Sequence, residues 1–216
     1  MAVRFVLFDF DGVLLDTEKL HQMTRKNIAR DLFGGEYEVD INTLIGGSAL
    51  DSYAALLKYF GREGDPAALT HLHYASLADY CCEHCAVASE DLLTLLDGLD
   101  ARGIGYGICS SSPYFYVEQI VEKMGLADRF RFYCGGDEVE HLKPAPDLYL
   151  LGVERSGCAR EEVIAIEDSR TGLAAAVAAG LPCLGYDYPE NEQDLSASVR
   201  IITNLSDMLC FIDGQG

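Results

Sequence analysis

The residues Asp9-Phe10-Asp11-Gly12-Val13-Leu14-Leu15-Asp16-Thr17 carry the strongest signal in this chain. They follow an apolar run, residues 3–8, which is interrupted only by Arg4 and predicts a buried β-strand. The first carboxylate therefore stands at the carboxyl end of a strand, where open α/β sheets bind ligands. Two aspartates so close repel each other, and a divalent cation would keep both ionised. An ordinary solvated turn is the alternative, so the interpretation depends on the rest of the chain.

Composition narrows the class of protein. The 216 residues, 49% of them hydrophobic, suffice for one domain or a main domain with an insertion. The 35 acidic residues outnumber the 16 basic ones, and the net charge of −19 argues against nucleic acid or an anionic membrane as a partner. No stretch approaches the roughly 18 apolar residues of a membrane span, and the N-terminal run is too short for a signal peptide. With eight cysteines that are expected to be reduced, we expect a cytoplasmic protein.

One group of thiols and imidazoles is a candidate for metal binding. On a helix Cys81, His84 and Cys85 would share a face, and His71 and His73 lie upstream. No second ligand pair recurs at the spacing of structural zinc modules, and free cysteine is a common buried side chain. The pattern favours buried thiols over zinc and leaves open whether the cluster binds anything.

Hydrophobic periodicity divides the chain into a helical part and a mixed part. From residue 16 to about 84, apolar residues at helical spacing and glycine-rich breaks predict three or four helices. From about residue 88, strands alternate with helices, which predicts a parallel α/β sheet with helices on both faces. After the first strand, we expect strands at 104–109, 130–133, 163–166, 181–186 and 199–202. The expected domains are a core of residues 1–15 and 88–216 and an inserted helical cap of residues 16–87, which would lie over the site.

Three further polar stretches follow predicted strands. Ser110-Ser111-Ser112-Pro113 offers hydroxyl and backbone N–H groups to an anion, although serine before proline also suits a helix cap. Lys143, in the stretch Lys143-Pro144-Ala145-Pro146-Asp147, would suit a phosphoryl group, or would be a surface lysine in a proline turn. Glu167-Asp168-Ser169 repeats the opening pattern of strand and carboxylates, and it too has a helix cap as its alternative.

In this order the four stretches resemble the motifs of the haloacid-dehalogenase-like (HAD) superfamily, in its branch with a helical cap inserted after the first motif. The resemblance covers essentially the whole chain and is strongest to sugar-phosphate phosphatases and β-phosphoglucomutases. It implies a Rossmann-like parallel sheet core with an all-helical cap. It also implies a Mg²⁺-dependent phosphatase that acts on a small phosphorylated metabolite, with sugar phosphates as the expected substrates. We expect a monomer or weak homodimer.

The resemblance assigns the reacting groups to the first motif. By resemblance, Asp9 is the nucleophile that takes the phosphoryl group as an aspartyl-phosphate. Asp11 protonates the leaving oxygen and then deprotonates the attacking water. Dehalogenases of the superfamily lack this second aspartate and use no metal, so Asp11 favours phosphoryl chemistry.

The remaining motifs supply ligands for the metal and the phosphoryl group, again by resemblance. Mg²⁺ would be held by the Asp9 carboxylate, the Asp11 backbone carbonyl, Asp168 and Glu167. The groups that would bind the substrate are Ser110, Ser111, Lys143 and His21. Phosphoryl transfer depends mostly on positioning and charge neutralisation, which a metal, a lysine and hydroxyl groups provide.

The residues leave a choice between hydrolysis and isomerisation. His21 matches a histidine of β-phosphoglucomutases, but related phosphatases have it too. Two mutase cations that hold a second phosphate correspond here to Ala49 and Pro113, and each charged hydrogen bond contributes about 1.5–3 kcal/mol. We therefore expect a phosphatase, with β-phosphoglucomutase as the alternative. A non-catalytic binding protein with the same fold is a further alternative.

Overall fold

The computed structural model describes residues 2–34, 48–189 and 191–214. Contacts between residues divide the chain into two compact units. One unit consists of Met1–Asp16 and Ala86–Gly216, and the other of Thr17–Cys85. The second unit is thus an insertion that begins directly after the acidic turn at Asp9 to Asp16.

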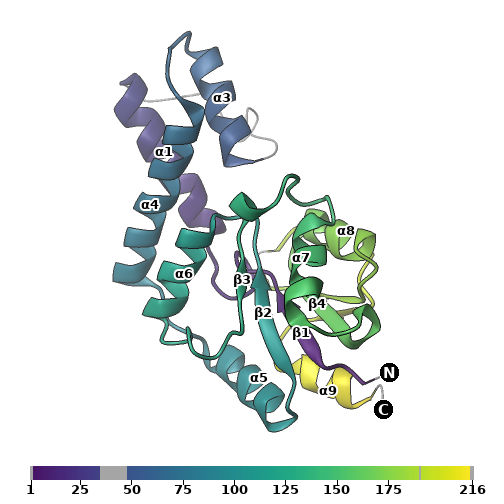
Figure 1. Cartoon of the computed structure of the whole chain (residues 1–216). Helices are drawn as coiled ribbons and strands as arrows, with labels where there is room; N and C mark the ends of the chain where they lie inside the picture. The colour runs from purple at the N-terminus through teal and green to yellow at the C-terminus, as the bar shows by residue number, and fades with distance from the viewer. Residues whose placement is uncertain (1, 35–47, 190, 215–216) are drawn as a thin grey trace. The chain divides into compact units, whose positions relative to one another are not determined.

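The first unit is built on a six-stranded sheet in which all neighbouring strands are parallel (Figure 1). The strand order is β3-β2-β1-β4-β5-β6. The strands are β1 (Phe5–Phe8), β2 (Gly105–Cys109), β3 (Tyr133–Cys134), β4 (Val163–Glu167), β5 (Cys183–Tyr186) and β6 (Arg200–Ile202). The chain runs from β1 to β2 and β3 on one side and returns to β4 on the other, so the strand order reverses beside β1. The predicted parallel α/β fold is confirmed.

The central strands are buried on both faces, which is why they are continuous apolar runs rather than alternating ones. Phe5 and Leu7 face the side covered by α7 (Asp147–Ser156) and α8 (Arg170–Ala178), with which they form one hydrophobic core. Since side chains alternate along a strand, Val6 and Phe8 face the opposite side, where they are also fully buried. The other α-helices in the described part of this unit are α5 (Glu90–Ala101), α6 (Tyr114–Lys123) and α9 (Asp207–Asp213), and two short 3-10 helices are η1 (Gly136–Glu138) and η2 (Arg160–Glu162).

The third strand differs from the sequence-based expectation. It was expected at 130–133, whereas regular pairing with β2 places Ile108 and Cys109 opposite Tyr133 and Cys134. The preceding residues make isolated backbone bonds to β2, from the Arg131 N–H to the Tyr106 carbonyl at 3.0 Å and from the Ile108 N–H to the Phe132 carbonyl at 3.1 Å, without forming regular strand. Their rings also pack on β1: the Phe132 ring stacks on Phe5, with centroids 5.4 Å apart, and Phe130 packs edge-on against Phe8. The aromatic pattern therefore marks both the approach to the strand and a packing surface on β1, and the regular strand begins at Tyr133.

The second unit is helical in its described part, with α1 (Glu18–Phe33), α3 (Ala49–Tyr59) and α4 (Pro66–His84). Ser48 and Asp51 form a capping box at the start of α3, and Asp65 caps α4 ahead of Pro66. A small core of Ile28, Ala29, Tyr53 and Leu56 joins the helices. The predicted glycine breaks at residues 35 and 46–47 lie outside the described residues. Among the helices that the structure describes, none is long and apolar enough to span a membrane.

Candidate active site

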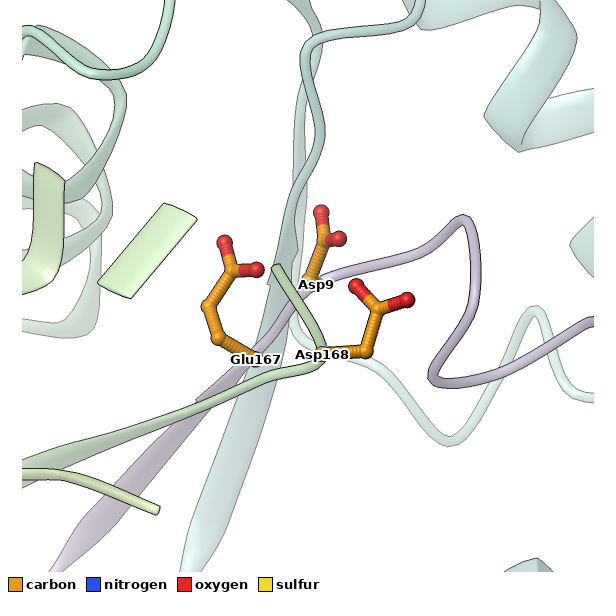
Figure 2. Close-up of side chains that lie close together, drawn as sticks. All are labelled: Asp9, Glu167 and Asp168. Atoms are coloured by element: carbon orange, nitrogen blue, oxygen red, sulfur yellow. The ribbon is translucent and has the colours of Figure 1, made fainter. Parts of the chain in front are cut away.

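Three carboxylates meet at the carboxyl ends of β1 and β4, where the strand order reverses. Asp9 follows β1, and its backbone N–H donates to the Ile166 carbonyl at 3.0 Å, which aligns it with Glu167 at the end of β4. One oxygen from each of Asp9, Glu167 and Asp168 lies within 4.8 Å of the others. Figure 2 shows the three side chains with their carboxyl groups on the same side of the strand ends. Two motifs far apart in the sequence therefore form one acidic cluster.

Lys143 lies inside this cluster. Its Nζ donates to Asp9 Oδ1 and to Glu167 Oε1, both at 2.6 Å, and to the Cys109 carbonyl at 2.9 Å. The Tyr149 hydroxyl donates to the same Glu167 oxygen at 2.6 Å. Only 6% of the Lys143 side chain is exposed, so it is not the surface lysine of the alternative interpretation.

The electrostatics of the cluster favour an additional cation. Burial, followed by the charge of Glu167, raises the pKa of Asp9 well above its usual value. The same two causes raise the pKa of Asp168 to about 7. Burial opposes charge on Lys143, but Asp9 and Glu167 outweigh it and raise the Lys143 pKa, so this lysine stays protonated. When all three carboxylates are ionised, the single positive charge of Lys143 leaves an excess of negative charge, which a divalent cation would neutralise.

The donor set of this cluster fits Mg²⁺. Mg²⁺ prefers oxygen ligands and is commonly bound through one or two carboxylates together with water and phosphate oxygens. Among the described residues, Asp9, Glu167 and Asp168 are the one group of three or more such side chains close enough together to hold a metal ion. Cys81, His84 and Cys85 do not form such a group, and His84 Nδ1 lies 2.9 Å from the Tyr80 carbonyl. The predicted metal contact of the Asp11 carbonyl remains a prediction.

The side chain of Asp11 accepts hydrogen bonds from two hydroxyl groups of the segment that follows β2. Ser112 Oγ donates to Asp11 Oδ2 at 2.5 Å, and the Tyr116 hydroxyl donates to Oδ1 at 3.1 Å. The turn that follows needs glycine at position 12, where φ is +87° and a Cβ atom would overlap the Asp168 carboxylate. The two aspartates of the first motif thus have different partners.

The serines lie at the end of β2, next to β1 in the sheet. Ser110 is buried, its N–H donates to the Cys134 carbonyl at 2.9 Å, and its Oγ accepts the Ser112 N–H at 3.0 Å. Ser111 is partly buried. The helix-cap interpretation of these serines is wrong for α6, because its N-cap residue is Pro113 and no side chain caps it. In the stretch Glu167-Asp168-Ser169, the helix-cap interpretation is confirmed for Ser169, whose Oγ accepts the Gly172 N–H at the start of α8. Asp168 belongs to the carboxylate cluster instead.

His21 lies on α1, in the second unit. Its Nδ1 is 2.9 Å from His73 Nε2, and His73 Nδ1 is 3.0 Å from the Tyr53 hydroxyl. His73 and Tyr53 are buried. The contact of His21 with substrate remains a prediction.

Several residues that shape the site carried no signal in the sequence. Tyr116 and Tyr149 donate to Asp11 and Glu167 from helices, and the Tyr188 hydroxyl donates to Asp168 Oδ2 at 3.3 Å. Gly172, in α8, lies so close to Glu167 that a Cβ atom there would overlap its carboxylate. A glycine at the start of a helix whose other small residues are alanines was the one available clue.

The replacement Gly172→Ala is expected to lower stability and weaken Mg²⁺ binding. Alanine ordinarily stabilises a helix relative to glycine by about 0.5–1 kcal/mol, but here it would displace Glu167, and overpacking costs about 1–3 kcal/mol. Denaturant unfolding and Mg²⁺ titration measure both effects. The matched control Val177→Ala changes an exposed position of the same helix. An increase in the stability of Gly172→Ala would contradict the tight packing.

The family to which the chain belongs follows from comparison with known proteins. Residues 6–186 match the family model of haloacid dehalogenase-like hydrolases. The chain therefore belongs to this family and is a hydrolase. The fold and the order of its motifs agree with that assignment.

Individual relatives narrow the comparison. A phosphoglycolate phosphatase from Yersinia pseudotuberculosis is 29% identical, with coverage of 96% of this chain and 92% of the relative. The β-phosphoglucomutase structure from Clostridium difficile superposes with a TM-score of 0.81 at 20% identity, covering 99% of this chain and 96% of that one. The structure of CbbY from Rhodobacter sphaeroides in complex with phosphate superposes with a TM-score of 0.80 at 22% identity, covering 98% of this chain and 99% of that one. The two structures share the fold of this chain.

Proposed function

We propose that this protein is a Mg²⁺-dependent phosphatase that hydrolyses small phosphate monoesters through an aspartyl-phosphate on Asp9. The observation that carries the proposal is the buried Lys143, which bridges Asp9 and Glu167 within a cluster of three carboxylates. A positive charge beside a carboxylate at a sheet edge suits a phosphoryl group. The name of the Yersinia pseudotuberculosis relative supports the same class of reaction.

The first half of the reaction transfers the phosphoryl group to the enzyme. An Asp9 carboxylate oxygen attacks phosphorus, a new O–P bond forms, and the bond from phosphorus to the ester oxygen breaks. Lys143 holds Asp9 Oδ1 at 2.6 Å and so fixes the orientation of the nucleophile. Asp11 gives its proton to the departing oxygen, which leaves as an alcohol.

The second half regenerates Asp9. Asp11, now a carboxylate, accepts a proton from water as the water oxygen attacks phosphorus, and the bond between phosphorus and Asp9 breaks to release inorganic phosphate. Ser110, Ser111 and Lys143 bind the phosphoryl oxygens. Asp9, Asp168 and Glu167 would hold Mg²⁺, whose positive charge would offset the repulsion between these carboxylates and an anionic substrate.

The substrate class is small phosphorylated metabolites, with sugar phosphates and 2-phosphoglycolate as the first candidates. The resemblance of the motifs suggests the former, and the name of the relative suggests the latter. β-Phosphoglucomutase activity is the second candidate, favoured by His21 and by the structural likeness. Ala49 and Pro113, at positions of two mutase cations, weigh against it.

A substrate panel tests the proposal. Inorganic phosphate release is measured from 2-phosphoglycolate and a series of sugar phosphates with Mg²⁺, and glucose 6-phosphate formation is measured from β-glucose 1-phosphate primed with bisphosphate. We expect hydrolysis of at least one ester, faster than isomerisation. An isomerisation rate above every hydrolysis rate would favour the mutase, and no turnover of any ester would remove the proposal.

Removal of metal is expected to abolish phosphate release and to lower stability. Mg²⁺ that binds only the folded protein stabilises it by about 2.7 kcal/mol at a concentration 100 times its Kd, so thermal unfolding should shift upward with added Mg²⁺ and return with chelator. Asp168→Asn should reduce this shift, whereas Asp128→Asn, at an exposed position, should not. An identical Mg²⁺ response of wild type and Asp168→Asn would contradict the assigned ligands.

A further inference from the structure

The carboxylate of Asp11 is held at both oxygens by hydroxyl groups from one segment of the chain. Ser112 Oγ donates to Oδ2 at 2.5 Å, and the Tyr116 hydroxyl donates to Oδ1 at 3.1 Å. Both donors belong to the segment that leads from β2 into α6. One hydrogen bond leaves a carboxylate free to turn about its last torsion, whereas two bonds at different oxygens fix its plane.

Tyr116 is itself rigidly placed. It lies fully buried in the first turn of α6, and its backbone N–H donates to the Pro113 carbonyl at 3.1 Å. Its ring packs edge-on against Phe10, the residue between the two aspartates, with centroids 5.7 Å apart and an interplanar angle of 84°. The hydroxyl group therefore reaches Asp11 from a support that has little freedom to move.

The backbone turn at Asp11 is closed by hydrogen bonds, but these do not set the direction of the Asp11 side chain. The next residue is Gly12, at φ +87°, in a short turn closed by a bond from the Gly12 N–H to the Leu15 carbonyl at 2.8 Å. An acid–base group must lie within hydrogen-bond reach of the proton that it transfers, and a displacement of about 1 Å can cost about 10²-fold in rate.

We propose that Tyr116 is a positioning residue that orients Asp11 for proton transfer in the reaction. This inference rests on the proposed function. Tyr116 acts through Asp11 and does not itself touch the substrate. Ser112 is its partner in holding the carboxylate.

The inference predicts that Tyr116→Phe affects only the steps that move a proton. An alkyl phosphate needs a proton on its leaving oxygen, so we expect kcat/KM for alkyl esters to fall about 10-fold, part of the 10²–10⁴-fold that acid–base catalysis supplies. p-Nitrophenolate leaves without a proton. The first-turnover rate with p-nitrophenyl phosphate should therefore be nearly unchanged, while steady-state turnover falls because water attack still needs Asp11 as a base.

Stopped-flow and steady-state assays measure these rates in wild type, Tyr116→Phe and Asp11→Asn. Asp11→Asn should show the same pattern with larger losses, and Ser112→Ala should repeat it if Tyr116→Phe does not fold. The matched control is Tyr106→Phe, because Tyr106 is also buried and its hydroxyl donates to a carboxylate, Asp100, at 3.0 Å. Tyr106→Phe should not lower alkyl ester hydrolysis relative to the first turnover of p-nitrophenyl phosphate.

Three results distinguish the outcomes. A selective loss of the proton-dependent steps in Tyr116→Phe supports the inference. Equal losses in the first turnover of the aryl ester and in alkyl ester hydrolysis, or no loss in either, would overturn it while leaving the phosphatase proposal intact. An inactive wild type would remove the proposed function, and this inference with it.

Discussion

Replacing Asp9 by asparagine is expected to abolish phosphate release and to leave the fold intact. The amide has nearly the same shape but cannot act as the nucleophile, and the expected loss of at least about 10³-fold corresponds to about 4 kcal/mol of activation free energy. Stability should change little, because the amide removes the burial cost of the charge and the repulsion from Glu167 and Asp168 together with the Lys143 attraction, and Lys143 keeps its bond to Glu167. Phosphate release and denaturant unfolding of the metal-free proteins give the two values.

The exposed Asp128→Asn is the control for Asp9→Asn, since it makes the same chemical change away from the cluster. It should match wild type in both measurements. Retention of a substantial part of the wild-type rate in Asp9→Asn would exclude Asp9 as the nucleophile. If Asp9→Asn loses both activity and folding, the assay is repeated with Mg²⁺ on the folded fraction of the variant. That fraction should still release no phosphate.

Replacing Lys143 by methionine is expected to cost both stability and activity. Methionine keeps much of the volume but leaves Asp9 and Glu167, each 2.6 Å from Nζ, without their counter-charge. Removing one partner of a buried ion pair typically destabilises by about 3–5 kcal/mol. Activity should fall by at least about 10²-fold, because the developing charge on the phosphoryl group loses a fixed cation. Urea unfolding and phosphate release measure the two effects.

Added Mg²⁺ and a control variant at a second lysine distinguish the electrostatic cause of the stability loss from the cause of the activity loss. Mg²⁺ should restore part of the stability of Lys143→Met, since it supplies positive charge to the same carboxylates, but it should not restore the activity. Lys123→Met, which changes an exposed lysine on α6, should behave as wild type. If Lys143→Met unfolds at the same denaturant concentration as wild type, the bridging role of Lys143 is wrong.

The sequence predicted the sheet and the convergence of its motifs because both depend on simple rules. An apolar run buried on both faces marks a central parallel strand, as β1 and β4 show. Polar residues that follow such strands meet at one edge of the sheet, which predicts that Asp9, Lys143 and Glu167 lie close together. The third strand was misplaced because aromatic residues favour strands and packed surfaces alike, and Phe130 and Phe132 serve the surface.

The residues that support the site could not be predicted from the sequence, for a physical reason. Tyr116 reaches Asp11 across 105 positions, and Tyr149 reaches Glu167 from another helix. Neither contact follows from periodicity, because a buried tyrosine in a helical stripe has the same spacing whether or not its hydroxyl meets a carboxylate. Gly172 became informative only once its distance from Glu167 was known. The substrate contact of His21 and the role of the helical insertion as a cap remain predictions.

The most direct test is to find the residue that carries the phosphoryl group during turnover. The enzyme is mixed with Mg²⁺ and its best substrate from the panel, quenched in acid within the first turnovers, digested and analysed by mass spectrometry. The account predicts one added phosphoryl group on the peptide that contains Asp9, and its absence in Asp9→Asn. A phosphoryl group on another residue, such as Ser110, would contradict it.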